Sequence, residues 1–116
     1  MSIRAIVVTG KSLYEQVHEV QIESYKDYYK HICCDLFDIV RTKWDGEDIS
    51  IYLDDEGLLK PQNYGRLVEG YPEPLFGNLV ITGGVDAEGD TLPLPDKFNV
   101  INILKYIGEI KYVTRG

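Results

Sequence analysis

Three acids at alternating positions follow two glycines in the segment ITGGVDAEGDT. Asp86, Glu88 and Asp90 have the spacing of the first three ligands in an EF-hand calcium loop. The glycine and glutamate that complete such a loop are replaced here by threonine and lysine. A phosphate-binding loop is disfavoured, because its lysine is missing and the acids would repel phosphate. We expect a solvated turn after a strand, and the alternative is a small-ligand or divalent-metal site on loop 83–90.

The histidines and the adjacent cysteines could serve as zinc ligands or as a nucleophile with its base. Cys33 and Cys34 would point in different directions on a helix, and no second ligand pair such as CxxC or HxxxH is present. A thiol nucleophile would need His18 or His31 as its base, and nothing marks an oxyanion hole. We therefore predict a protein that is not an enzyme, has no catalytic, cofactor or metal residues, and keeps reduced thiols in the cytoplasm.

The acidic residues are concentrated in two short stretches. The formal net charge is −7, with 19 acids against 12 bases. Residues 45–56 hold six acids and no base, and residues 86–96 hold four acids and no base. Direct binding to nucleic acid is disfavoured, since it requires clustered lysine and arginine. The pattern favours a partner protein with a basic surface, and the alternative is that the charge serves solubility alone.

Nine tyrosines are many for 116 residues. Three of them fall on more than one face of an expected helix, so some rings should stay exposed, as is typical of protein contact surfaces. The alternative is packing with the hydroxyl groups in water. The predicted partner-binding residues are these tyrosines and the acids of the first stretch: Tyr25, Tyr28, Tyr29, Asp45, Glu47, Asp48, Asp54, Asp55 and Glu56.

The elements that would hold these residues are mostly strands. IRAIVVT at 3–9 is continuously apolar after its arginine, as in a strand covered on both faces. Asp45-Gly46 is a strong two-residue hairpin turn, because glycine accepts the positive φ that such turns require. The sequence predicts strands at 3–9, 17–22, 36–43, 48–54, 75–82 and 109–114, with a helical turn near 62–68 as an option.

Two helices complete the predicted fold. Ser24 is an expected N-cap for a helix over 24–33. Apolar residues at i, i+3, i+4 and i+7 predict a second helix over 96–107. The prediction is one α+β domain, 1–116, with a mostly antiparallel sheet of five or six strands and two main helices packed on one face. No apolar run is long enough to cross a membrane, and an edge strand at 109–114 leaves a homodimer open.

Three segments carry a family resemblance: IRAIVV, ISIYLDDEGLLKPQN, and GNLVITGGVDAEGDTLPLPD running into the second expected helix. The chain resembles a family of small proteins carried by bacteriophages, plasmids and gut or soil bacteria, described only as a domain of unknown function. The resemblance implies a cytosolic protein of phage or mobile-element type and supplies no catalytic residues. Gly65-Arg66 departs from the helix formers that are commoner there, which argues against a helix at 62–70.

Together these features predict a small acidic, non-catalytic protein that binds a host protein. The target would be a defence nuclease or another nucleic-acid-binding protein, with carboxylates taking the place of phosphates. The alternative is the small-ligand or divalent-metal module on loop 83–90.

Overall fold

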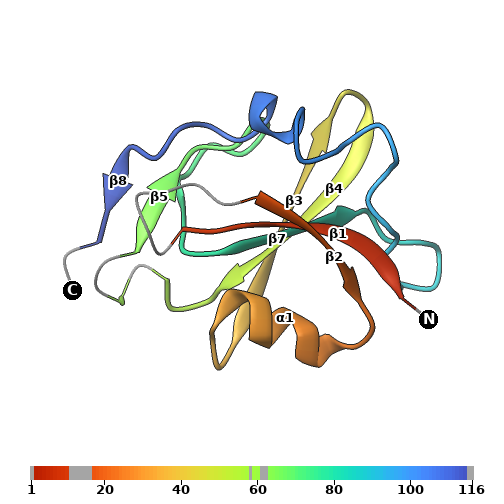
Figure 1. Ribbon diagram of the computed structural model, residues 1–116, viewed down its shortest axis with the longest axis horizontal. Helices are drawn as coiled ribbons and strands as arrows, with labels where there is room; N and C mark the ends of the chain where they lie inside the picture. Colours follow the sequence, from red (N-terminus) through yellow and green to blue (C-terminus); the bar gives the residue numbers. More distant parts are fainter. Residues whose placement is uncertain (1, 11–16, 58, 61–62, 115–116) are drawn as a thin grey trace.

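The computed structural model describes residues 2–10, 17–57, 59–60 and 63–114 of the chain. Its centre is a five-stranded antiparallel sheet with the strand order β2-β1-β7-β4-β3 (Figure 1). A smaller antiparallel sheet has the order β6-β5-β8. The elements are β1 Ile3–Val8, β2 Val17–Ile22, α1 Tyr25–Ile32, β3 Phe37–Trp44, β4 Glu47–Asp54, β5 Tyr64–Arg66, β6 Leu75–Phe76, β7 Leu79–Gly83, the 3₁₀ helix η1 Ile103–Lys105 and β8 Tyr112–Val113.

The large sheet is covered on both faces. Helix α1 packs on one face, and the small sheet and the segment around η1 cover the other (Figure 1). Strand β1 shows the result, because Ala5 and Val7 join the core under α1 while Ile6 and Val8 join the larger core opposite. The expectation of a first strand covered on both faces is confirmed for Ala5 to Val8, which are buried on both sides, whereas Ile3 and Arg4 at the start of β1 are partly exposed.

The predicted hairpin is present. Asp45 has φ 53° and Gly46 has φ 80°, the two positive angles of a turn whose twist matches that of the flanking strands. Trp44 pairs with Glu47 across this turn, and the ladder continues to Phe37 opposite Asp54. This register determines which side chains of β3 lie beside those of β4 on each face.

The first predicted helix is also present. The Ser24 hydroxyl accepts the N–H of Lys26, and the Asp27 carboxylate accepts the N–H groups of Glu23 and Ser24. These two backbone donors hold the pKa of Asp27 below its usual value, because they favour the ionised form. The helix ends at Cys33, which has a left-handed φ of 61°.

The prediction of a second helix over 96–107 is wrong, and α1 is the one α-helix in the described residues. Asn99 accepts the N–H groups of Ile101 and Asn102 through its side chain, and the Asn102 side chain caps Asn99 in return. Such side-chain bonds give the backbone an alternative to a helix. Only the short 3₁₀ turn of η1 forms, and its first residue, Ile103, is buried.

The prediction of a single sheet with two helices on one face is wrong for a further reason. The predicted strand at 75–82 is interrupted at Gly77, whose φ is 87°, so β6 joins the small sheet and β7 the large one. The helical turn considered near 62–68 is instead strand β5. Gly65 in β5 lies so close to the Phe76 ring that a Cβ there would come within 2.5 Å of it. The fold is therefore mostly β, with two sheets and one α-helix.

None of the helices in the described ranges has the length and apolar character that crossing a bilayer requires.

Candidate functional site

The acids predicted at 45–56 separate into two groups at opposite ends of β4. At the hairpin tip, Lys97 Nζ lies 2.9 Å from Asp45 Oδ2 and 3.9 Å from Glu47 Oε1. Asp48 pairs with Lys43 at 3.4 Å. Nearby lysines therefore partly neutralise the tip acids.

The second group lies about 20 Å along β4 from the first, because Asp54 follows Asp48 by six residues and an extended strand rises about 3.4 Å per residue. Asp54 is buried, and its Oδ2 lies 2.6 Å from Lys60 Nζ while its Oδ1 accepts the N–H of Glu56 at 2.9 Å. The hydrogen bond from Lys60 to this carboxylate raises the lysine pKa. Asp55 and Glu56 are exposed. Asp54 is thus part of a structural ion pair.

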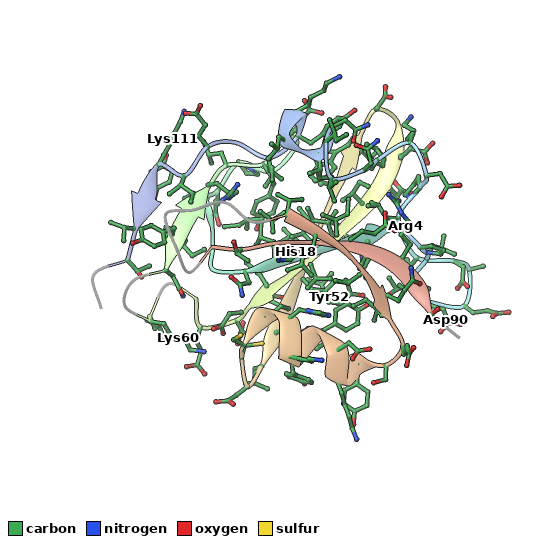
Figure 2. The ribbon with its side chains drawn as sticks, in the orientation of Figure 1. Arg4, His18, Tyr52, Lys60, Asp90 and Lys111 are labelled. Carbon is green, nitrogen blue, oxygen red and sulfur yellow. The ribbon has the colours of Figure 1, made fainter. Side chains whose placement is uncertain are left out.

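The three predicted tyrosines have different environments. Tyr25 is 63% exposed and meets Tyr29 edge to face. Tyr28 is buried and stacks on Tyr52 at a centroid distance of 3.9 Å. Figure 2 shows Tyr52 between α1 and the sheet. Burial raises the pKa of Tyr28 well above its ordinary value, since the phenolate would be desolvated. Tyr29 is half-buried against Phe37. Of the three rings, that of Tyr25 is the one a partner could cover.

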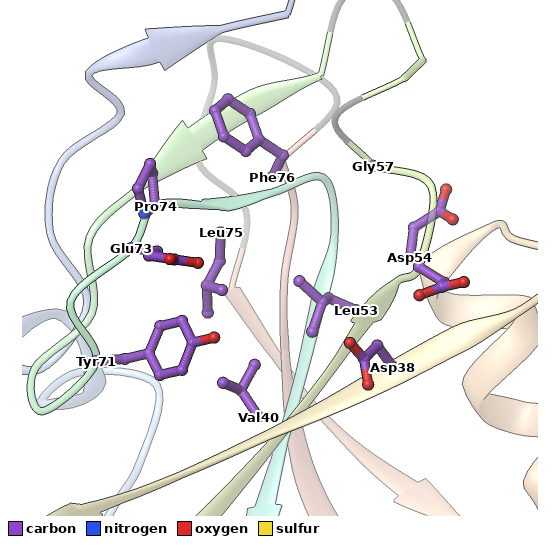
Figure 3. A pocket seen from close by; sticks show the side chains of 11 residues that line it. Asp38, Val40, Leu53, Asp54, Gly57, Tyr71, Glu73, Pro74, Leu75 and Phe76 are labelled. Atoms are coloured by element: carbon purple, nitrogen blue, oxygen red, sulfur yellow. The ribbon is translucent and has the colours of Figure 1, made fainter.

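A cavity of about 170 Å³ lies on the β3–β4 face that is opposite α1. Figure 3 shows Asp38 and Asp54 on one side of it and Glu73 on the other, with Leu53 and Leu75 between them. The residues that line it are Asp38, Val40, Leu53, Asp54, Asp55, Gly57, Tyr71, Glu73, Pro74, Leu75 and Phe76. The cavity, called the acidic pocket below, combines an apolar floor with four acidic residues in its lining.

Segment 69–74 forms one wall of the acidic pocket because β3 holds it in place. The carbonyl oxygen of Glu69 accepts both the Thr42 hydroxyl at 3.0 Å and the Trp44 indole N–H at 2.8 Å. Gly70 then passes so close to β3 that a Cβ would come within 2.1 Å of Thr42 Oγ1. This contact places Tyr71 above the β3 surface.

The opposite wall is the turn that follows β4. Gly57 N–H donates to the carbonyl of Asp54 at 3.1 Å, which closes the turn. A Cβ at Gly57 would approach the carbonyl oxygen of Phe76 to 3.0 Å, so the turn fits tightly against β6. The acidic pocket is therefore built from three chain segments that are distant in sequence.

The charges of the acidic pocket are one-sided. None of its lining residues, all of them in the described part of the chain, is basic. Lys60 neutralises Asp54 from outside, whereas Asp38, Asp55 and Glu73 make no ion pair with any described residue. Asp38 Oδ1 accepts only the N–H of the next residue, at 2.8 Å. Three carboxylates thus remain available to a cation.

The acids of loop 83–90 lie elsewhere. Asp86 Oδ1 accepts the N–H groups of Glu88 and Asp90, which closes a tight turn. Potential ligand oxygens of these three acids lie within 4.8 Å of one another. Figure 2 shows Asp90 near the N-terminus, at the far end of the molecule from Lys60 and hence from the acidic pocket.

The histidines and cysteines assemble no catalytic group among the described residues. His18 is exposed on β2, and His31 is half-buried on α1, where burial lowers its pKa. Both thiols are free, and burial raises the pKa of Cys34, which makes it a poorer nucleophile at neutral pH.

Sequence reasoning missed Asp38, Tyr71 and Glu73. Their neighbours in sequence give no motif, and the segments meet only through the fold. The one available signal was the hairpin register, which places Asp38 directly opposite Leu53.

Comparison with known proteins gives one result. No curated protein and no solved structure matches the chain. A family model described as a domain of unknown function matches residues 3–109. Because this match covers nearly the whole chain, the protein belongs to that family, DUF3846.

Proposed function

We propose that this is a small, non-catalytic interaction protein that binds a partner protein by taking one lysine or arginine side chain into the acidic pocket. The observation that carries the proposal is the set of three carboxylates without cations, Asp38, Asp55 and Glu73, around an apolar floor. A phage or mobile-element origin, a cytoplasmic location, and a host defence or nucleic-acid-binding protein as target belong to this proposal.

The size of the acidic pocket supports a single side chain as its occupant. Its volume of about 170 Å³ is below the roughly 300–1,000 Å³ of pockets that hold drug-sized ligands or cofactors. Lysine and arginine carry a long apolar stem and a charged end. The stem would pack on Val40, Leu53 and Leu75, and the charged end would meet the carboxylates.

The test is affinity capture from host cytoplasm with two matched double variants. The variant Asp38→Asn with Glu73→Gln removes two charges from the acidic pocket. The control Glu88→Gln with Asp90→Asn removes two charges from the remote loop, where neither side chain makes a hydrogen bond to a described residue. Both variants have the same net charge, so any difference between them reports position alone.

We expect the pocket variant to lose the captured partner and the loop control to keep it. The retained partner should also dissociate more readily as salt rises, because screening weakens attraction between charges. Equal capture by both variants would show that the acidic pocket is not the contact.

A second candidate function rests on the carboxylate oxygens of Asp86, Glu88 and Asp90, which lie close enough to hold one cation. We propose divalent-metal binding at loop 83–90 as this alternative. It predicts that Ca²⁺, Mg²⁺ or Zn²⁺ raises the Tm by several degrees, and that Asp90→Asn abolishes the rise. No change in Tm with any of the three ions would exclude it.

A further inference from the structure

Strand β3 is the free edge of the large sheet beside the acidic pocket. The order β2-β1-β7-β4-β3 leaves its outer side without a neighbouring strand among the described residues. It has eight residues, whereas the edge strands β6 and β8 of the small sheet have two each. An unpaired strand of this length presents a row of backbone donors and acceptors to solvent.

Hydrogen-bond alternation identifies the outward groups. The N–H of Asp55 donates to the carbonyl of Leu36 at 3.1 Å. Alternate residues of an antiparallel strand exchange bonds with the same neighbour, so even-numbered residues of β3 pair with β4. The N–H and C=O groups of Ile39, Arg41 and Lys43 therefore point outward. Gly70 lies beside the Lys43 carbonyl, where a Cβ would come within 3.4 Å of the oxygen, so the open part of the edge is at Ile39 and Arg41. The Ile39 N–H agrees with this assignment, because its acceptor is the Asp38 carboxylate and not β4.

The two faces beside this edge carry opposite charge. Asp38 and Val40 project toward the acidic pocket. The odd-numbered residues project to the other face, where Arg41 and Lys43 are exposed. Lys43 has Asp48 at 3.4 Å, and Arg41 forms no ion pair with any described residue. A strand laid along β3 would meet negative charge on one face and positive charge on the other.

We infer that β3 accepts an extended segment of the partner protein as an added strand, with a basic residue on the pocket face and acidic residues at adjacent positions on the other face. This inference rests on the proposed function and specifies the partner's chemistry. Backbone pairing would supply affinity, and the alternating charges would supply register and specificity. A long basic side chain from the added strand can reach back over β3 to Asp38 and the acidic pocket.

A second copy of this chain fits the edge less well. Two antiparallel β3 strands related by a two-fold axis perpendicular to the sheet keep their like faces on the same side. Asp38 would approach the partner's acidic face, and Arg41 the partner's basic face. Like charges at neighbouring cross-strand positions are destabilising. The charge pattern therefore favours a different protein as the occupant.

The test uses short synthetic peptides of alternating threonine and valine around a charged centre, with NMR titration as the measurement. One peptide has a central lysine flanked by two glutamates, and its charge-swapped control has a central glutamate flanked by two lysines. We expect the first to bind at least tenfold more tightly. N-methylation of its pairing amides should weaken binding about tenfold or more, since each lost hydrogen bond contributes measurably.

A matched pair of protein variants tests the edge itself. Arg41→Pro blocks the outer side of β3 without removing a bond to β4, because the Arg41 N–H points outward. Arg41→Ala removes the same charge and leaves the edge open. Peptide affinity should fall about tenfold or more for Arg41→Pro relative to Arg41→Ala. Equal affinity for these two variants, or for the N-methylated and unmodified peptides, overturns the inference.

Three further outcomes separate this inference from the proposed function. If the Asp38→Asn and Glu73→Gln variant loses the captured partner while Arg41→Pro keeps it, the pocket function stands and strand addition is wrong. If no peptide binds, strand addition is likewise wrong, and the capture experiment alone decides the pocket function. If Arg41→Pro dissociates a homodimer, the edge belongs to a second copy and the inference is overturned.

Discussion

The ion pair between Asp54 and Lys60 should be a main stabilising contact at the rim of the acidic pocket. Lys60→Met removes the cation and keeps most of the apolar stem. The Asp54 side chain is 2% exposed, so its carboxylate would stay desolvated with the Glu56 N–H as its remaining described partner. Breaking a fully buried pair costs about 3–5 kcal/mol. The Lys60 side chain is 34% exposed, so we expect a smaller loss of about 2 kcal/mol.

The assay is urea unfolding of a double-mutant cycle with Asp54→Asn. The double variant should be more stable than additivity predicts, with a coupling of about 1–2 kcal/mol, because it leaves no unpaired charge. By thermal unfolding, Lys60→Met should lower the Tm by roughly 6–12 °C. The matched control is Lys43→Met, since Lys43 pairs with Asp48 where both side chains are about 70% exposed. That change should cost less than about 1 kcal/mol.

The pH dependence gives a second measurement on the same pair. The pKa of Lys60 is raised above 10.5, so the folded state holds its proton more tightly than the unfolded state. The stabilising contribution is therefore complete below about pH 10.5 and is lost as pH rises through the folded-state pKa. The reasoning is refuted if Lys60→Met is no more destabilising than Lys43→Met. It is equally refuted if the difference between wild type and Lys60→Met shrinks already between pH 7 and 9.

Three other contacts give predictions that unfolding experiments can check. Tyr52→Phe and Thr91→Val should each lower the free energy of unfolding by about 1 kcal/mol, because the two hydroxyls share one 2.6 Å hydrogen bond. The double variant should lose only a few tenths of a kcal/mol more than either single variant, because that bond can be lost only once. Phe98→Ala should cost about 3–5 kcal/mol, since the ring is 0% exposed although no helix surrounds it; a loss below 1 kcal/mol would place that segment outside the core. Asp27→Ala should destabilise the fold at neutral pH. The lowered pKa of Asp27 means that this difference is present above pH 3.8 and disappears as pH falls further, and a difference that grows in acid would contradict the capping role.

The sequence correctly predicted the elements that are determined by a few neighbouring residues. The Ser24 cap and the Asp45-Gly46 turn each depend on a few adjacent residues, and both are present as expected. The apolar stripe at 96–107 led to a wrong helix prediction, because burial of the apolar side chains and local hydrogen bonding of the backbone have opposite requirements there. Ile103 and Ile107 are buried, as the stripe requires, but Asn99 bonds the backbone locally and a helix does not form. Arg4 then holds this segment, since its guanidinium donates to the carbonyls of residues 94, 95 and 98.

Local sequence signals could not predict the acidic pocket, because three chain segments from two sheets assemble it. Asp38 and Leu53 become neighbours through the hairpin register, which the sequence does indicate. Glu73 lies beside the pocket only because Gly70 can pack directly against Thr42. The residues around Gly70 contain no motif that would predict this close contact. The number of carboxylates can be read from the sequence, but which of them line the same cavity can be seen only in the folded structure.

The position of each charge, more than the total, determines what the acidic surface can bind. The hairpin-tip acids have lysines within 4.0 Å, so a partner's cation there would have to compete with Lys97 or Lys43. Three carboxylates of the acidic pocket, those of Asp38, Asp55 and Glu73, face no such competitor among the described residues, and the apolar floor lowers the cost of burying a long side chain. A partner that recognises net charge alone should lose the same affinity for the pocket variant and for the loop control, because both remove two charges. A partner that recognises the geometry of the pocket should lose affinity for the pocket variant alone.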